Sequence, residues 1–144
     1  MKRVVIVGGV AGGMSAATRL RRLDATAEII VLEKSGHVSD ANCGLPYYVG
    51  GVIETEDALL LQTPDSLHKR FRLDVRIASE ALSINRANKT IAVRNLLTGE
   101  EYELNYDKLV LSPGASPIRP NFPGSERAMT LRTVEDVERI ALAV

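Results

Sequence analysis

The sequence of 144 residues is poor in features that mark several common classes of protein. Its one cysteine, Cys43, cannot form an internal disulfide, so we expect a reducing, cytoplasmic location. Its two histidines, His37 and His68, lack metal-ligand spacing, and no zinc signature is present. The 18 basic and 18 acidic side chains cancel, which argues against nucleic acid or an anionic membrane as partner. No apolar run approaches the ~18 residues of a membrane span.

The first 34 residues follow a regular order of apolar, glycine-rich and amphipathic segments. Residues 3–7 and 28–32 are apolar, β-branched runs typical of buried parallel strands. The first run is too short, and breaks into glycines too early, for a signal peptide. Between the runs, a glycine-rich turn leads into MSAATRLRRL, which predicts a helix from Met14 of about three turns. The order predicts a βαβ unit over residues 1–34.

The rest of the chain predicts a meander followed by a return to the parallel sheet. Residues 35–63 are loop-rich, residues 64–71 form a helix beginning at Pro64, and residues 74–77 form a short strand. Three alternating segments, at 81–87, 89–96 and 101–106, predict an antiparallel β-meander over about 80–106. An apolar strand from 108 ends in a Ser-Pro-Gly turn, and Thr133 is the expected N-cap of a last helix. We predict one α/β domain.

The glycine-rich turn has the chemistry of a dinucleotide site. Gly8 supplies a turn without Cβ, while Gly12 and Gly13 open the helix N-terminus to a pyrophosphate, whose charge the helix dipole favours. Val10 stands where the G-x-G-x-x-G motif has its middle glycine. Glu33 ends the second strand, where a carboxylate accepts ribose hydroxyls and repels a 2′-phosphate, so the site suits FAD or NAD. The alternative for Glu33 is a solvated strand end.

The antiparallel segments decide between these cofactors, because an NAD-binding domain would continue with alternating strands and helices. With VVIVGGVAGG…EIIVLEK, ANCGLPYYVGG and YDKLVLSPGASP in that order, the whole chain resembles the pyridine nucleotide–disulfide oxidoreductase family. It is most similar to the single-cysteine branch of coenzyme A-disulfide reductases, CoA persulfide reductases and NADH oxidases. The resemblance implies a Rossmann-like, three-layer FAD-binding domain over residues 1–144, read as the N-terminal part of a homodimeric flavoenzyme. The NAD(P)H-binding and dimerisation domains would lie outside it.

The resemblance also implies roles for individual residues. FAD would contact the glycine loop, the end of the second strand, the Cys43 loop, the start of the meander and the Ser-Pro-Gly turn: Gly8, Val10, Ala11, Gly12, Gly13, Glu33, Lys34, Asn42, Ala81 and Gly114. CoA disulfide or CoA persulfide would be held by Ser15, Arg19, Arg22, Ser39 and Asn42. The first three of these are spaced i, i+4, i+7 and share a helix face, and arginine suits phosphate. The alternative is a solvated helix face.

Cys43, in a loop expected over residues 35–50, matches the redox-active cysteine of this branch. Many disulfide reductases have a second cysteine five residues later, where this chain has Tyr48. The Cys43 thiolate would therefore attack a disulfide alone and hold one half as a mixed disulfide until reduced flavin resolves it. The alternative is a buried, inert cysteine. Ala11 replaces a histidine that assists the oxidases, which favours CoA substrates over peroxide chemistry.

One departure concerns the substrate site. The resemblance leads us to expect a basic substrate contact where this chain has Phe71, and Lys69, Arg70 and Arg72 are its neighbouring candidates. The sequence thus predicts the FAD-binding portion of an NAD(P)H-dependent reductase of CoA disulfide or persulfide. An NADH oxidase or another single-cysteine reductase is the alternative within enzymes. Outside them, a non-catalytic nucleotide-binding module or a degenerate, empty dinucleotide fold remains open.

Overall fold

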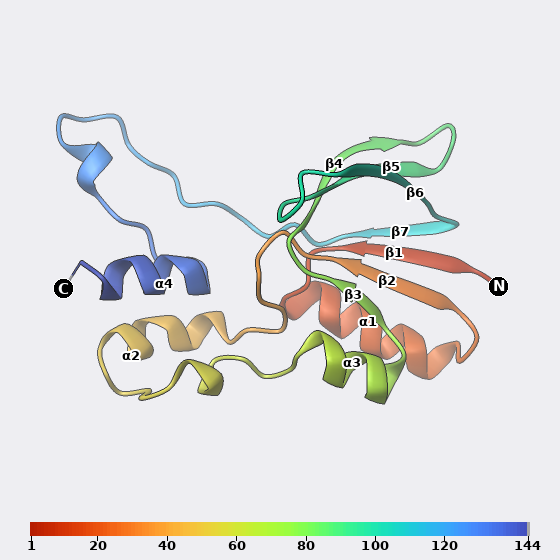
Figure 1. Cartoon of the computed structure of the whole chain (residues 1–144), viewed down its shortest axis with the longest axis horizontal. Coiled ribbons are helices and arrows are strands. Elements are labelled where there is room, and N and C mark those ends of the chain that lie inside the picture. The colour runs from red at the N-terminus through yellow and green to blue at the C-terminus, as the bar shows by residue number, and fades with distance from the viewer. Residues whose placement is uncertain (144) are drawn as a thin grey trace. The chain divides into compact units, whose positions relative to one another are not determined.

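A computed structural model describes residues 1–143, and the chain divides into two compact units (Figure 1). Unit 1 comprises residues 1–39 and 62–113, and unit 2 comprises residues 40–61 and the chain from Gly114 onward. Within residues 1–143, every helix is too short or too polar to cross a lipid bilayer.

A four-stranded parallel sheet forms the centre of unit 1. Its strands are β1 (Arg3–Val7), β2 (Glu28–Leu32), β3 (Asp74–Arg76) and β7 (Lys108–Leu111), in the order β3-β2-β1-β7. The bounds of β1 and β2 are those predicted, and β3 ends one residue before its predicted limit. Strands β1 and β2 are almost fully buried on both faces, which explains their unbroken apolar sequence.

Two helices, α1 (Ala11–Leu23) and α3 (Pro64–Phe71), contribute to the core on one face of this sheet. The core there consists of alternate strand residues and apolar helix residues, which include Val4, Ile6, Ile29, Val31, Met14, Ala17 and Leu67. α3 begins at Pro64 as predicted, after a Thr63 N-cap that forms a capping box with Ser66. Its C-cap, Arg72, is left-handed with φ +50°.

The prediction that α1 starts at Met14 is wrong, because its first turn is built from the glycine loop and begins at Ala11. Gly13 is buried in that turn, and a Cβ added to it would lie 1.8 Å from the backbone oxygen of Gly8. A helix can therefore start this close to β1 only with glycine at position 13. The apolar periodicity that revealed the helix is weak in this first turn, where glycines replace side chains.

The antiparallel meander covers the other face of the parallel sheet. It consists of β4 (Ser79–Asn85), β5 (Thr90–Asn95) and β6 (Glu101–Asn105), with a register shift between Ala81 and Ser83. A shared core joins the two sheets: Val5, Ile30, Leu32, Ile91, Val93 and Leu104. The first strand lies two residues earlier than predicted, but the three-layer α/β fold of helices, parallel sheet and meander is confirmed.

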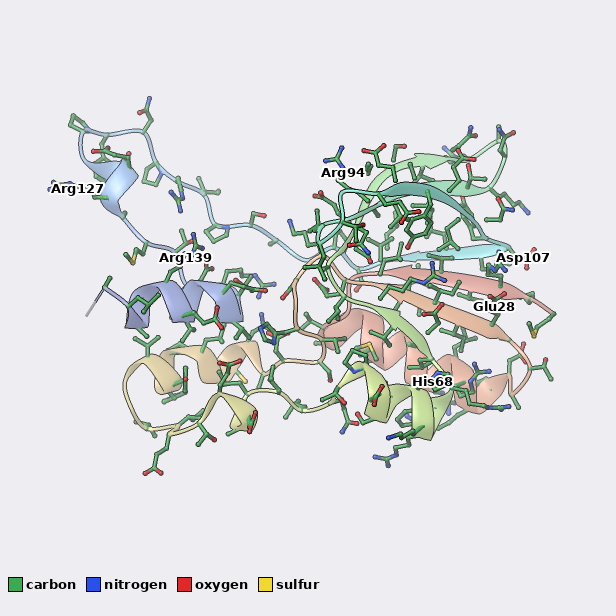
Figure 2. The ribbon with its side chains drawn as sticks, viewed as in Figure 1. Glu28, His68, Arg94, Asp107, Arg127 and Arg139 are labelled. Atoms are coloured by element: carbon green, nitrogen blue, oxygen red, sulfur yellow. The ribbon has the colours of Figure 1, made fainter. Side chains whose placement is uncertain are left out.

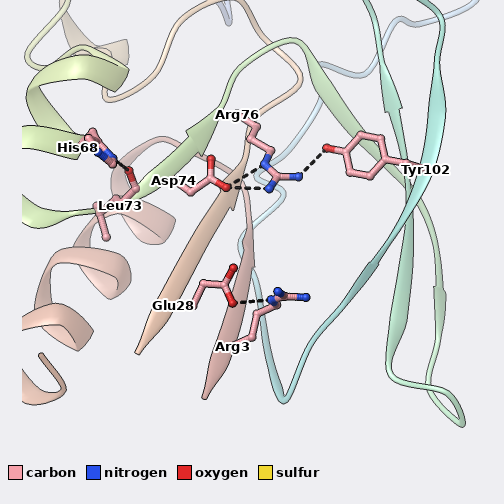
Figure 3. Close-up of polar contacts among 7 residues, drawn as sticks. All are labelled: Arg3, Glu28, His68, Leu73, Asp74, Arg76 and Tyr102. Carbon is pink, nitrogen blue, oxygen red and sulfur yellow. Dashed lines mark hydrogen bonds and ion pairs between the residues drawn. The ribbon is translucent and has the colours of Figure 1, made fainter. Parts of the chain in front are cut away.

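A half-buried arginine joins β3 to the meander (Figure 3). The Arg76 guanidinium donates to the Asp74 carboxylate at 2.7 and 3.1 Å and to the Tyr102 hydroxyl at 3.1 Å. It also lies 5.7 Å from the centre of the Tyr102 ring. The hydrogen bond that Arg76 donates to Asp74 raises the pKa of Arg76, and the one that it donates to Tyr102 adds to this shift, so the cation is fixed between two layers.

Unit 2 is built from short helical segments. These are the 3₁₀ turns Asn42–Gly44, Glu56–Ala58 and Ser125–Arg127 and the helices α2 (Leu45–Val49) and α4 (Val134–Ala141). α2 and the turns around it lie where the sequence suggested loops. Thr133 is the N-cap of α4 as predicted, and its capping box with Asp136 is complete. The core of the unit consists of Leu45, Leu59, Val134 and Val137.

Candidate functional site

The turn after β1 brings three segments of unit 1 together. Gly8 has φ +103°, and a Cβ on it would lie 2.0 Å from the backbone oxygen of Ser112, which follows β7. A Cβ on Gly12 would lie 2.9 Å from the Ser112 hydroxyl oxygen. The loop thus leaves no room for side chains at these two positions, and its backbone is open to a ligand group at the N-terminus of α1.

Glu33 holds this loop from the end of β2. Its side chain is only 8% exposed, so it is not the solvated strand end that the sequence left open. One carboxylate oxygen accepts the Gly9 N–H at 2.7 Å, and the other accepts the Ser35 N–H at 2.9 Å. The sequence analysis predicted a ribose contact for Glu33 but not these two bonds to the backbone. An acid directly after a strand and close to a glycine-rich turn is the signal that could have indicated them.

A cavity of about 190 Å³ lies at the carboxyl ends of the strands in unit 1. Gly8, Glu33, Lys34 and Ala81, four of the residues expected at FAD, line it together. Ser79, Glu80 and Pro113 also line it and were not expected. Crevices at this edge of a parallel sheet are where nucleotides bind in such folds. The other expected loop residues form the N-cap and first turn of α1: Val10, Ala11, Gly12 and Gly13.

The residues expected at the substrate divide between the two units. Ser15, Arg19 and Arg22 are all exposed on α1, as their spacing predicts. Arg22 donates through Nε to the Thr18 carbonyl at 3.3 Å. Ser39, with φ +56°, donates its N–H to Gly9 at 2.8 Å. Ser15 and Ser39 line a second cavity of unit 1, whereas Asn42 belongs to unit 2.

Cys43 is an exposed, free thiol in the 3₁₀ turn of unit 2 that precedes α2, so it is not the buried cysteine that was the alternative. Gly44 behind it is buried, and a Cβ there would lie 2.8 Å from a methyl group of Leu59. The Asn42 amide donates to the Arg132 carbonyl at 3.1 Å. Packing behind the thiol and a hydrogen bond beside it therefore fix the backbone that presents the sulfur.

Two further residues named from the sequence are Gly114, expected at FAD, and His68, for which no role was predicted. Gly114, in unit 2, has φ +72°, and a Cβ on it would lie 3.2 Å from the Arg132 guanidinium. His68 lies near the end of α3 with Nδ1 3.3 Å from the Leu73 carbonyl oxygen (Figures 2 and 3). This contact gives His68 a local, structural partner in unit 1.

The glycine loop, the buried acid and the three layers agree with a known family. The family model for pyridine nucleotide-disulphide oxidoreductases matches residues 2–144. The chain belongs to this family. Among curated members of the pyridine nucleotide-disulphide oxidoreductases, the coenzyme A disulfide reductase of Staphylococcus epidermidis is 44% identical over 140 residues. That match covers 97% of the chain and 32% of the relative, so the chain spans about a third of the curated relatives it matches.

Solved structures of this oxidoreductase family agree in fold as well as sequence. Reduced CoADR-RHD of Bacillus anthracis is similar at a TM-score of 0.95 and 52% identity, over 98% of this chain and 26% of that one. An NAD-dependent persulfide reductase from A. fulgidus is similar at a TM-score of 0.92 and 40% identity, with the same coverage of 98% and 26%.

Proposed function

We propose that the chain is the FAD-binding portion of an NAD(P)H-dependent reductase of CoA disulfide or CoA persulfide. The observation that carries the proposal is one exposed cysteine in a chain 44% identical to a coenzyme A disulfide reductase and 52% identical to CoADR-RHD. Cys43 has no second thiol within these 144 residues, and in this proposal it exchanges with a disulfide or persulfide that enters from outside.

The residues of unit 1 fit the ADP half of FAD. Gly8 and Gly12 lie so close to Ser112 that a Cβ would not fit, and the N–H groups at the start of α1 suit a pyrophosphate. Glu33, at the rim of the nucleotide cavity, is anchored for hydrogen bonds to a ribose, while Lys34 and Ala81 line the same cavity. Bound FAD supplies the two-electron relay from NAD(P)H to the disulfide. Val10, Ala11, Gly13, Asn42 and Gly114 complete the proposed FAD contacts.

Cys43 is the nucleophile in this proposal. Its thiolate attacks one sulfur of CoA disulfide, the S–S bond breaks, and the first CoA leaves as a thiolate. The product is a mixed disulfide between Cys43 and the second CoA. Two electrons and a proton derived from NAD(P)H then regenerate the thiolate and release the second CoA as a thiol. The exposure of Cys43 supports this role, because the chemistry needs access for a large substrate.

The polar face of α1 is the proposed contact for the rest of the substrate. Ser15, Arg19 and Arg22 are exposed along this face and present two guanidinium groups suited to phosphates. Ser39 and Asn42 complete the proposed set.

An anaerobic titration of the complete protein tests the function. The flavin absorbance should bleach with NADH or NADPH and recover when CoA disulfide is added. The Cys43→Ser variant should still bleach but should not recover, because the nucleophile is missing. Recovery in air but not with CoA disulfide would replace the proposal with an NADH oxidase. Complete protein without flavin absorbance would contradict the FAD site.

A further inference from the structure

The 3₁₀ turn that carries Cys43 runs directly into α2, so residues 42–49 form one helical run (Figure 1). The exposed positions in this run and at its C-cap include Cys43, Pro46, Tyr47 and Gly50, which are spaced i, i+3, i+4 and i+7. Residues with this spacing lie on one face of a helix. Tyr47 is therefore the side chain one turn beyond the thiol on the same exposed face.

The opposite side of this helical run is packed into the core of unit 2. Gly44 and Leu45 are buried there, and Tyr48 is half-buried against the same core. A rotation that turned Tyr47 inward would bring these core residues into water, at a cost in free energy that grows with the apolar area exposed. The packing thus holds the face that carries Cys43 and Tyr47 toward solvent.

Tyr47 offers a large and well-anchored contact surface one turn from the thiol. The residue is 59% exposed, so its ring is open to a ligand. Its carbonyl accepts the N–H groups of Val52 at 2.8 Å and Ile53 at 3.1 Å, which fixes the backbone beneath the ring. A tyrosine side chain has few torsions to fix on binding, so it supplies contact area at a small cost in entropy.

The segment around the thiol carries no charged side chain. No residue in the range 41–53 is acidic or basic, although 25% of the chain is charged, and Asp40 and Glu54 at its two ends are both acidic. A carboxylate brought against this face would lose water without gaining a cation of the segment as partner, which costs free energy. The exposed face of Cys43 and Tyr47 therefore favours neutral ligand groups over anionic ones.

We propose that Tyr47 sets the disulfide specificity of the complete enzyme, because its ring packs on a neutral arm next to the reacting sulfur and leaves a charged arm without a partner. This inference rests on the proposed function, and it assigns a specificity-determining residue on α2. The arm next to each sulfur of CoA disulfide is an uncharged chain of amides and methyl groups. Glutathione disulfide instead carries carboxylates and an ammonium group on each arm. Tyr47 thus accepts the first kind of arm and selects against the second.

Steady-state kinetics of the complete protein with two phosphate-free disulfides tests this proposal. The wild type should have a kcat/KM for pantetheine disulfide, whose arms are neutral, about 10-fold or more above that for glutathione disulfide. Tyr47→Ala should lower kcat/KM for pantetheine disulfide about 10-fold, since an aromatic contact is lost, and Tyr47→Phe should recover most of that loss. Tyr47→Arg, which supplies a cation, should raise kcat/KM for glutathione disulfide about 5-fold or more and lower it for pantetheine disulfide.

Phe122→Arg is the matched control, because Phe122 is another exposed aromatic residue of unit 2, at 53%, and lies outside residues 41–53. It should leave kcat/KM for both disulfides at wild-type values. Bleaching of the flavin by NADH or NADPH, a step without disulfide, should be equal in every variant and reports intact folding. A wild type without preference between the two disulfides, or an unchanged preference in Tyr47→Arg, would overturn the role of Tyr47 while leaving the reductase intact. Wild-type protein that reduces neither of them nor CoA disulfide would instead contradict the proposed function, and this inference with it.

Discussion

The Glu33→Gln substitution should lower the free energy of unfolding by more than the exchange of one atom suggests. Both carboxylate oxygens accept backbone N–H groups, from Gly9 at 2.7 Å and from Ser35 at 2.9 Å, and the side chain is 8% exposed. Glutamine has one acceptor oxygen, so its NH₂ group must face one of these N–H donors. One charge-assisted bond is lost and the other becomes neutral, which costs about 2–4 kcal/mol in the free energy of unfolding.

Urea denaturation of the flavin-free chain measures this loss. With a dependence of ~2 kcal/mol per molar urea, the midpoint should fall by about 1–2 M. Glu101→Gln is the matched control, because that carboxylate pairs with Arg94 at 2.7 Å but is 55% exposed. It should change the free energy of unfolding by less than about 1 kcal/mol. Equal midpoints for the two variants would refute the anchoring role of Glu33.

Three smaller changes test other contacts of unit 1. Gly13→Ala would set a methyl carbon 1.8 Å from the backbone oxygen of Gly8. It should lower the free energy of unfolding by about 3 kcal/mol or more. A loss below about 1 kcal/mol in urea denaturation would contradict this contact. Tyr102→Phe removes a hydroxyl 3.1 Å from the Arg76 guanidinium and should cost about 1 kcal/mol in thermal denaturation, with near-UV circular dichroism preserved. Hydrogen bonds from Thr26 lower the pKa of Asp24, so they stabilise the fold above the ordinary aspartate pKa and are lost as pH falls through the lowered value. Thr26→Ala should raise that pKa in an NMR titration, and an unmoved pKa would count against the bond.

The parts of the fold that the sequence predicted well have strong local signals. Strands β1 and β2 are buried on both faces, so their apolar runs end where the strands end. α3 and α4 begin at Pro64 and after Thr133, whose side-chain and backbone chemistry favours a helix start. α2 has Pro46 in its first turn, but its five residues are too few to show a helical period. Packing around Leu45 stabilises it instead.

In the candidate site, too, some neighbours could be predicted from the sequence and others could not. Gly8 and Glu33 were predictable as neighbours, because the carboxyl ends of adjacent parallel strands meet at one edge. Glu80 and Pro113 line the same cavity, but they reach it from β4 and from the turn after β7. No local sequence pattern predicts that Glu80 and Pro113 line one cavity, because this depends on how the meander folds over the sheet. The second cavity of unit 1, which Ser15 and Ser39 line, likewise depends on the tertiary packing of α1 with α3.

The contact between Gly8 and Ser112 has a consequence for the order of folding. β1 lies between β2 and β7, so the first strand to be synthesised receives its second neighbour only after the whole meander. A chain that has emerged only as far as β6 leaves one edge of β1 bare and the glycine turn without the residue that packs on it. Pairing over so long a stretch of chain is slow, because the loop must close before it gains contacts. The cavity that we propose for FAD includes Pro113 in its wall, so it is complete only in a chain that has extended past this residue.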